Sequence, residues 1–286
     1  MKKSSLAIQG IFFAIAAISG TSVFAEEVVV DSGADIEWCT FRKDATTVTS
    51  HAGASTTISN LNKDSYAWGY LPYAVKLDVG QSISITATLS YTSKSSSSEG
   101  PFYFGIFNSG ENSRPAEEME FSSIVDGTGT MTGFFACTST NSDGVVQTKV
   151  YSRHKPRDGY GFMATTQGKD YLVFDTTPSA LSMPVAMEDY VFTIAATRAQ
   201  NGYDVSVSDG VDSYSMNFTG DKSTAVSVFD VIGFRSPGAS MTFSDLSITT
   251  TGAIIAIPEP SFLGMVVGFI AIVMVATRRR KLQRAR

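Results

Sequence analysis

Apolar and hydroxyl residues alternate along Ser82–Ser90, and this alternation limits the fold more than any other feature of the chain. Ile83, Ile85, Ala87 and Leu89 are separated from one another by single serine or threonine residues. A two-residue period predicts a β-strand with one face in a core and the other in solvent.

Similar runs recur about every ten residues, and helix signals are almost absent between positions 26 and 252. Phe102–Phe107 is apolar throughout, as expected for a central strand. Tyr190–Thr197 and Tyr203–Val207 flank Gln200–Gly202, whose Asn-Gly pair is a strong hairpin signal. The sequence therefore predicts an all-β antiparallel sandwich of the jelly-roll type over 26–252.

The two ends of this predicted domain are less regular. Glu26–Asn62 is weakly patterned and indicates an outer strand or two. The closing strands are predicted at Val226–Phe234 and Met241–Thr249. A brief stalk that connects the domain to the last segment is predicted at Thr249–Ala253.

The last segment, 253–286, predicts a membrane anchor. The run 261–277 contains no charge, and it just reaches the length of about 17 residues that a spanning helix needs. Six cationic residues follow this run and should remain in the cytoplasm: Arg278, Arg279, Arg280, Lys281, Arg284 and Arg286. The alternative is a buried C-terminal helix of a soluble domain, which would leave these cations at the end of a helix without a polar face.

The first 25 residues predict a signal peptide. Met1–Lys3 is positively charged, Leu6–Ile18 is mostly apolar, and Val23–Ala25 offers compact residues for cleavage. We expect cleavage after Ala25, which makes Glu26 the new N-terminus; an uncleaved N-terminal anchor is the alternative. Both ends then place the main domain outside the cell and the basic tail inside.

The order of Pro258, Glu259 and Pro260, an apolar run and Arg278–Arg280 resembles the PEP-CTERM sorting signal of Gram-negative bacteria. The resemblance covers about 30 residues. It implies recognition by an exosortase-type processing enzyme in the inner membrane. It also implies removal of the tail and transfer to the cell surface or to extracellular polysaccharide.

Two pairs of segments resemble the concanavalin A-like, laminin-G-type jelly roll. One pair is Leu77–Ile85 with Phe104–Asn108, and the other is Val231–Arg235 with Phe243–Ile248. The latter pair is similar to the terminal strand pair of that fold. This resemblance implies a fold and says little about activity.

The exported portion is strongly acidic. Without the cations at both ends and Glu259, 14 of the 22 basic and 26 of the 27 acidic residues remain, which gives a net charge near −12. Such a charge opposes long-range attraction to nucleic acid and to polyanionic glycans. It suits solubility, or divalent cations that bridge the protein to acidic polysaccharide.

Cys39 and Cys137 both lie in the exported portion, where an oxidising compartment allows pairing. A disulfide and two buried free thiols both remain open. No ligand spacing connects these cysteines with the histidines, so no zinc site is expected.

Glu118 and Glu120 are the best candidates for the paired carboxylates of a glycan hydrolase, because they would share a face of a strand. A solvated acidic loop after Pro115 is the competing interpretation. The candidates for a calcium site are Asp126, Asp143 and Asp209. Each precedes a glycine, and an Asp-Gly pair is more typical of a turn than of a metal site.

Tyr66, Trp68 and Tyr70 form the densest aromatic group, and they could stack on a sugar ring or lie in the core. We therefore expect an exported, non-enzymatic structural or adhesive module that binds polysaccharide. It would need no cofactor beyond a calcium ion, and it would bind no nucleic acid. A glycan lyase or hydrolase and a calcium-dependent lectin are the alternatives.

Overall fold

The computed structural model describes residues 26–29, 36–41, 48–52, 55–59, 61, 65–92, 101–110, 119–120, 128–140, 145–155, 161–165, 172–174, 181–220, 226–235 and 240–256. The predicted signal peptide, the Pro258–Pro260 tripeptide, the segment 261–286 and Glu118 lie outside these ranges. Within them, no helix has the length and apolar character needed to cross a bilayer.

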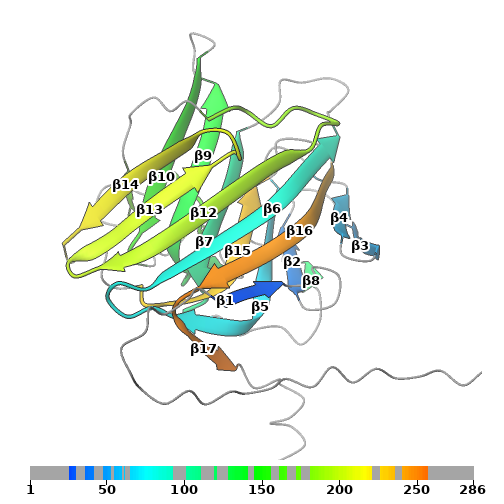
Figure 1. Cartoon of the computed structure of the whole chain (residues 1–286). Helices are drawn as coiled ribbons and strands as arrows, with labels where there is room; N and C mark the ends of the chain where they lie inside the picture. The colour runs from blue at the N-terminus through cyan, green and yellow to red at the C-terminus, as the bar shows by residue number, and fades with distance from the viewer. Residues whose placement is uncertain are drawn as a thin grey trace, which may run out of the picture.

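The described residues form a sandwich of two sheets whose pairings are antiparallel apart from one short edge contact, β2 with β8 (Figure 1). The first sheet has the order β14-β13-β12-β6-β16-β4-β3, and β1 also pairs with β16. Its strands are β1 (Glu26–Val29), β3 (Val48–Ala52), β4 (Ser55–Ser59), β6 (Ser82–Thr92), β12 (Tyr190–Ala199), β13 (Gly202–Ser208), β14 (Ser213–Thr219) and β16 (Ser240–Thr250).

The second sheet has the order β11-β10-β9-β7-β15-β5-β2-β8, and β17 also pairs with β5. Its strands are β2 (Glu37–Phe41), β5 (Tyr66–Lys76), β7 (Phe102–Asn108), β8 (Met119–Glu120), β9 (Thr132–Thr140), β10 (Val146–Arg153), β11 (Leu172–Phe174), β15 (Val228–Arg235) and β17 (Ala253–Ala256). The predicted all-β antiparallel sandwich is therefore confirmed, and the arrangement is consistent with a jelly roll.

The strand and hairpin predictions hold in detail. Ile83, Ile85, Ala87 and Leu89 are at most 1% exposed and point into the space between the sheets. The hairpin turn forms where the Asn-Gly pair predicts it, because Ala199 pairs with Gly202. β7 lies between β15 and β9, as expected for the apolar run that forms it.

Aromatic side chains hold the two sheets together. The Trp38 ring from β2 stacks on the Phe243 ring from β16, with centroids 5.5 Å apart and planes 9° apart. Phe234 from β15 also contacts Phe243, at 4.2 Å between centroids. Ring pairs of this kind add to the gain from apolar burial, so this cluster fixes the separation of the layers.

The two segments predicted as the closing strands form β15 and β16. β15 and β16 follow each other in the chain, but they belong to different sheets and do not pair with one another. They face each other across the core through Phe234 and Phe243. The reason is that each strand has an apolar face that must be buried, and the opposite sheet provides the cover.

The ends of the domain are more ordered than predicted. β1 begins at Glu26 and pairs with β16 over four residues. The stalk expected at Thr249–Ala253 is wrong, because β16 continues to Thr250 and Ala253–Ala256 forms β17 against β5. The sandwich thus extends four residues beyond the boundary predicted at 252.

Candidate functional site

The outer face of the second sheet carries a continuous row of side chains across six strands. The cross-strand register pairs Lys149 with Cys137, Cys137 with Tyr103, Tyr103 with Arg235, Arg235 with Tyr66 and Tyr66 with Phe41. We call these six residues the rim row. Phe41 ends β2, Tyr66 begins β5 and Arg235 ends β15, so the row follows one end of these strands.

Exposure varies along the rim row. Lys149, Arg235, Tyr66 and Phe41 are half-buried. Tyr103 and Cys137 between the two cations are 5% and 6% exposed. The row therefore has two cations and two aromatic rings that are half-buried, with two almost completely buried side chains between the cations.

Arg235 lies between two tyrosine rings. Its guanidinium carbon is 4.9 Å from the centre of the Tyr103 ring and 5.4 Å from that of the Tyr66 ring. Both distances are within the range of cation–π attraction. The two rings restrict the orientation of the guanidinium group at the surface.

The groups between the two cations are uncharged near neutral pH. Burial raises the pKa of the Tyr103 phenol, and the adjacent Cys137 raises it further. Burial also raises the pKa of the Cys137 thiol. The row therefore contributes two positive charges and no negative charge.

The next row on the same face is covered. It consists of Tyr151, Phe135, Gly105, Gly233, Trp68 and Cys39, which the same register brings side by side. Phe162 and Met163, both fully buried, lie on this row. A Cβ atom added at Gly233 would come within 2.2 Å of the Phe162 ring, so the ring occupies the space that a side chain at position 233 would need.

This covered region is a second apolar core. The Phe162 ring meets Phe107 edge-on with centroids 4.7 Å apart, and it meets Trp68 at 6.0 Å. Phe135 stacks on Tyr151 at 4.7 Å. The segment 161–165 therefore covers this second row, whereas four of the six rim-row residues are half-buried.

A buried cation lies at the far side of the covered region. Arg153 is 0% exposed, and its Nη2 atom donates a hydrogen bond to the Gly129 carbonyl oxygen at 2.8 Å. Burial lowers the pKa of this guanidinium to about 10, so it keeps its charge near neutral pH. Its burial excludes it from contact with a large ligand at the surface.

The aromatic platform predicted at Tyr66, Trp68 and Tyr70 does not form as a unit. Trp68 and Tyr70 are 0% and 1% exposed because Phe162, Met163 and their neighbours cover them. Only Tyr66 reaches the surface. Sequence reasoning missed Arg235, Lys149 and Tyr103, which join it from strands far apart in the chain.

Cys39 and Cys137 are both buried free thiols. They lie on β2 and β9, with β5, β15 and β7 between them in the sheet. Four strand spacings amount to about 19 Å, whereas a disulfide needs Cα atoms within about 7 Å. Of the two arrangements left open, the structure has the free thiols.

The described residues do not provide the acidic centres considered from the sequence. Glu120 lies on the edge strand β8, and Glu118 is outside the described ranges. The described residues contain no group of three or more His, Cys, Asp or Glu that could hold a metal ion. Asp126 and Asp143 are also outside these ranges.

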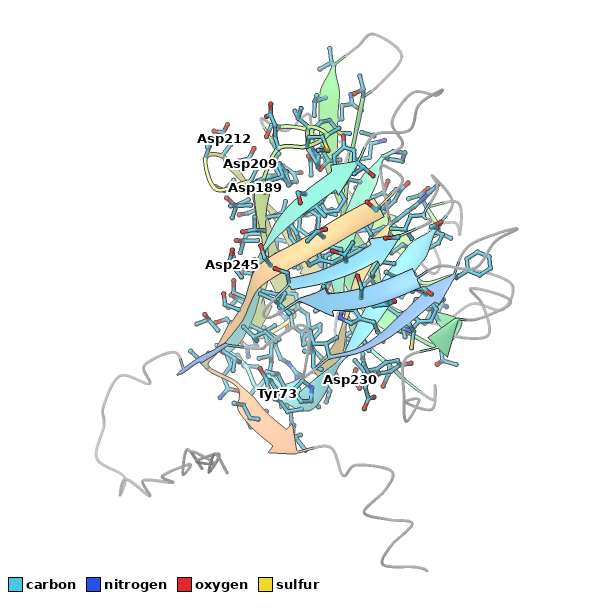
Figure 2. All side chains as sticks on the ribbon, turned by 90° about the vertical axis from the view of Figure 1, so that its right-hand side faces the viewer. Tyr73, Asp189, Asp209, Asp212, Asp230 and Asp245 are labelled. Atoms are coloured by element: carbon cyan, nitrogen blue, oxygen red, sulfur yellow. The ribbon has the colours of Figure 1, made fainter. Side chains whose placement is uncertain are left out.

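Asp209 acts as a turn residue. Its carboxylate accepts hydrogen bonds from the backbone N–H groups of Ser182, Val211 and Asp212 and from the Ser182 hydroxyl, at 2.8–3.0 Å. Burial alone raises its pKa, but these donors outweigh burial and lower the pKa to about 2. Asp189, Asp209 and Asp212 lie together at one end of the sandwich (Figure 2).

Comparisons with known proteins give structural likeness at low identity. No family model and no curated protein matches the sequence. The metal-free carbohydrate recognition domain of Emp46p is 10% identical with a TM-score of 0.44, over 76% of this chain and 89% of that one. Peanut lectin is 12% identical with a TM-score of 0.46, over 82% of this chain and 99% of that one. A legume lectin-like domain from Entamoeba histolytica is 8% identical with a TM-score of 0.42, over 84% of this chain and 100% of that one.

Proposed function

We propose that this protein is an exported, non-enzymatic module that binds polysaccharide through the rim row, after delivery to the cell surface or extracellular matrix. The observation that carries the proposal is the placement of Arg235 between the Tyr66 and Tyr103 rings at the surface of a sheet. Aromatic rings stack on the apolar faces of sugars, and a cation beside them binds hydroxyl or acidic groups.

The described strands lie between the predicted signal peptide and the predicted tail. The first paired strand begins at Glu26, the residue that cleavage after Ala25 would make N-terminal. The last strand ends at Ala256, two residues before Pro258. Processing at both predicted positions would leave all described strands intact.

The binding function is tested on the full chain purified in detergent. Immobilised neutral and acidic polysaccharides are the probes, and retention of the wild type is compared with that of Tyr66→Ala. We expect the wild type to bind at least one polysaccharide, and the substitution to weaken binding because it removes the half-buried ring of Tyr66. A protein that binds none of the probes would contradict the proposal. The appearance of new chain ends in the polysaccharide would instead favour the alternative of a glycan lyase or hydrolase.

The export function is tested by measuring the intact mass of the protein in membrane and surface fractions of its native host. A species that begins at Glu26 and lacks Arg278–Arg286 is the expected result. A species that begins at Glu26 but retains this basic tail would mean a permanent membrane anchor, and the sorting proposal would be wrong.

A further inference from the structure

We infer that the polysaccharide bound by the rim row is anionic, with carboxylate or sulfate groups that contact Arg235 and Lys149. This inference rests on the proposed function and specifies its ligand. The acidic charge of the exported portion favours the opposite, or a bridging divalent cation. The inference is based on the six residues of the rim row, which include two cations and no acidic residue.

The two cations are spaced for an extended ligand. Lys149 on β10 and Arg235 on β15 are separated by three strand spacings, through Cys137 on β9 and Tyr103 on β7. Neighbouring strands lie about 4.8 Å apart, so the distance between the two backbone positions is about 14 Å. A chain with repeated anionic groups can extend along this separation and contact both cations.

The surface between the cations favours such a chain. Tyr103 and Cys137, the two residues between the cations, are almost completely buried. Burial raises the pKa of both groups, so neither presents a negative charge to an anionic ligand. The complete row spans five strand spacings, about 24 Å, which is enough for several sugar units.

Arg235 is suited to the recognition of carboxylate or sulfate. A guanidinium group donates two parallel hydrogen bonds to such an anion, which gives directional as well as electrostatic selectivity. The tyrosine rings on either side already limit its motion, so binding orders it little further. The half-buried Tyr66 ring lies next in the row, where it can stack on the sugar that carries the anionic group.

The rest of the domain is acidic, and this affects how an anionic polysaccharide would bind to the rim row. Repulsion at long range slows the approach of a polyanion, so the affinity must come from groups in direct contact. Substituting one rim cation should then have a large effect, whereas substituting an exposed cation elsewhere should have almost none. This difference separates a defined site from general electrostatic attraction.

The experiment uses the full chain in detergent, with polygalacturonate and dextran sulfate as anionic probes and dextran as the neutral probe. The variants are Arg235→Gln, Lys149→Gln and the matched control Lys76→Gln. Lys76 is exposed and ends β5, the strand that Tyr66 begins. Affinity is measured with and without EDTA, and near-ultraviolet circular dichroism shows whether each variant keeps its tertiary packing.

We expect the wild type to bind an anionic probe at least about tenfold more tightly than dextran, with or without EDTA. Arg235→Gln should weaken anionic binding about tenfold and Lys149→Gln several-fold, because each loses a charge-assisted contact. Lys76→Gln should stay within about twofold of the wild type. Tyr66→Ala should weaken the binding of any sugar that stacks there, so it tests the row independently of charge.

Three results would overturn the inference. If dextran binds as tightly as the anionic probes and Arg235→Gln changes nothing, the protein binds polysaccharide but does not select anions. If EDTA abolishes binding and the rim variants leave it intact, a bridging cation is responsible. If no probe binds, the proposed function itself fails.

Discussion

The guanidinium carbon of Arg235 lies 4.9 Å from the centre of the Tyr103 ring, although 132 positions separate the two residues in the chain. They meet because β15 and β7 pair in a register that places them opposite one another. The same register aligns Tyr66 on the other side of Arg235. Strand pairing therefore creates the candidate site, and no local motif in the sequence contains it.

The contact between Arg235 and Tyr66 should contribute measurably to stability. We expect a double-mutant cycle with Arg235→Gln and Tyr66→Leu to give a coupling energy of about 0.5–1 kcal/mol in urea unfolding of the full chain, because the aliphatic side chain lacks the ring's electrostatic attraction. A cycle between Arg235→Gln and Tyr214→Leu, which lies on β14 of the other sheet, is the control and should give no coupling. A coupling near zero for both pairs would show that the geometry has no energetic consequence.

The packing of the Phe162 ring against Gly233 leads to a second prediction. Gly233→Ala places a methyl group where the Phe162 ring lies, so we expect a loss of about 1–3 kcal/mol in the free energy of unfolding. Phe162→Ala should cost about 3–5 kcal/mol, because a fully buried ring leaves a cavity. In the Phe162→Ala background, Gly233→Ala should cost much less than in the wild type, since the clash is gone. Strictly additive losses would contradict this packing.

The separation of Cys39 and Cys137 predicts that the protein contains two free thiols. A thiol reagent should modify both cysteines after denaturation without reductant, and neither quickly in the native state, because both side chains are buried. Reductant should leave the unfolding midpoint unchanged. A mass 2 Da below that of the reduced chain, or a midpoint that falls on reduction, would show a disulfide between them and contradict the strand order.

The parts of the fold that depend on local pattern could be predicted from the sequence. The inward positions of Ile83 and Ile85 follow from alternation, and the turn before Gly202 follows from its Asn-Gly pair. Both faces of Phe102–Phe107 are apolar, which indicates a strand covered on two sides. These features are determined by residues within a few positions of one another.

The site could not be predicted in the same way, because it depends on contacts between distant segments. Tyr66, Trp68 and Tyr70 alternate on one face of β5, so the sequence alone does not show which of them is covered. The cover comes from Phe162, almost a hundred positions later, in a segment without strand periodicity. The sequence shows that Arg235 directly follows the apolar run Val231–Phe234, which indicates a cation at the end of a strand. It does not show which side chains lie beside Arg235, because these depend on the register of three strands.

The turn at Asp209 predicts a specific pH dependence of stability. The pKa of its carboxyl group is about 2 in the folded protein and 3.8 as the ordinary value, so the charged form is favoured by folding. The stabilisation is complete above about pH 4 and is lost as the pH falls through about 2. We therefore expect Asp209→Asn to lower the urea midpoint at pH 6, and the difference from the wild type to shrink between pH 4 and pH 2. The control is Asp212→Asn, which keeps the backbone N–H that Asp212 donates to Asp209 and should change the midpoint little at either pH. A difference between Asp209→Asn and the wild type that stays constant down to pH 2 would show that the charge on Asp209 does not stabilise the turn.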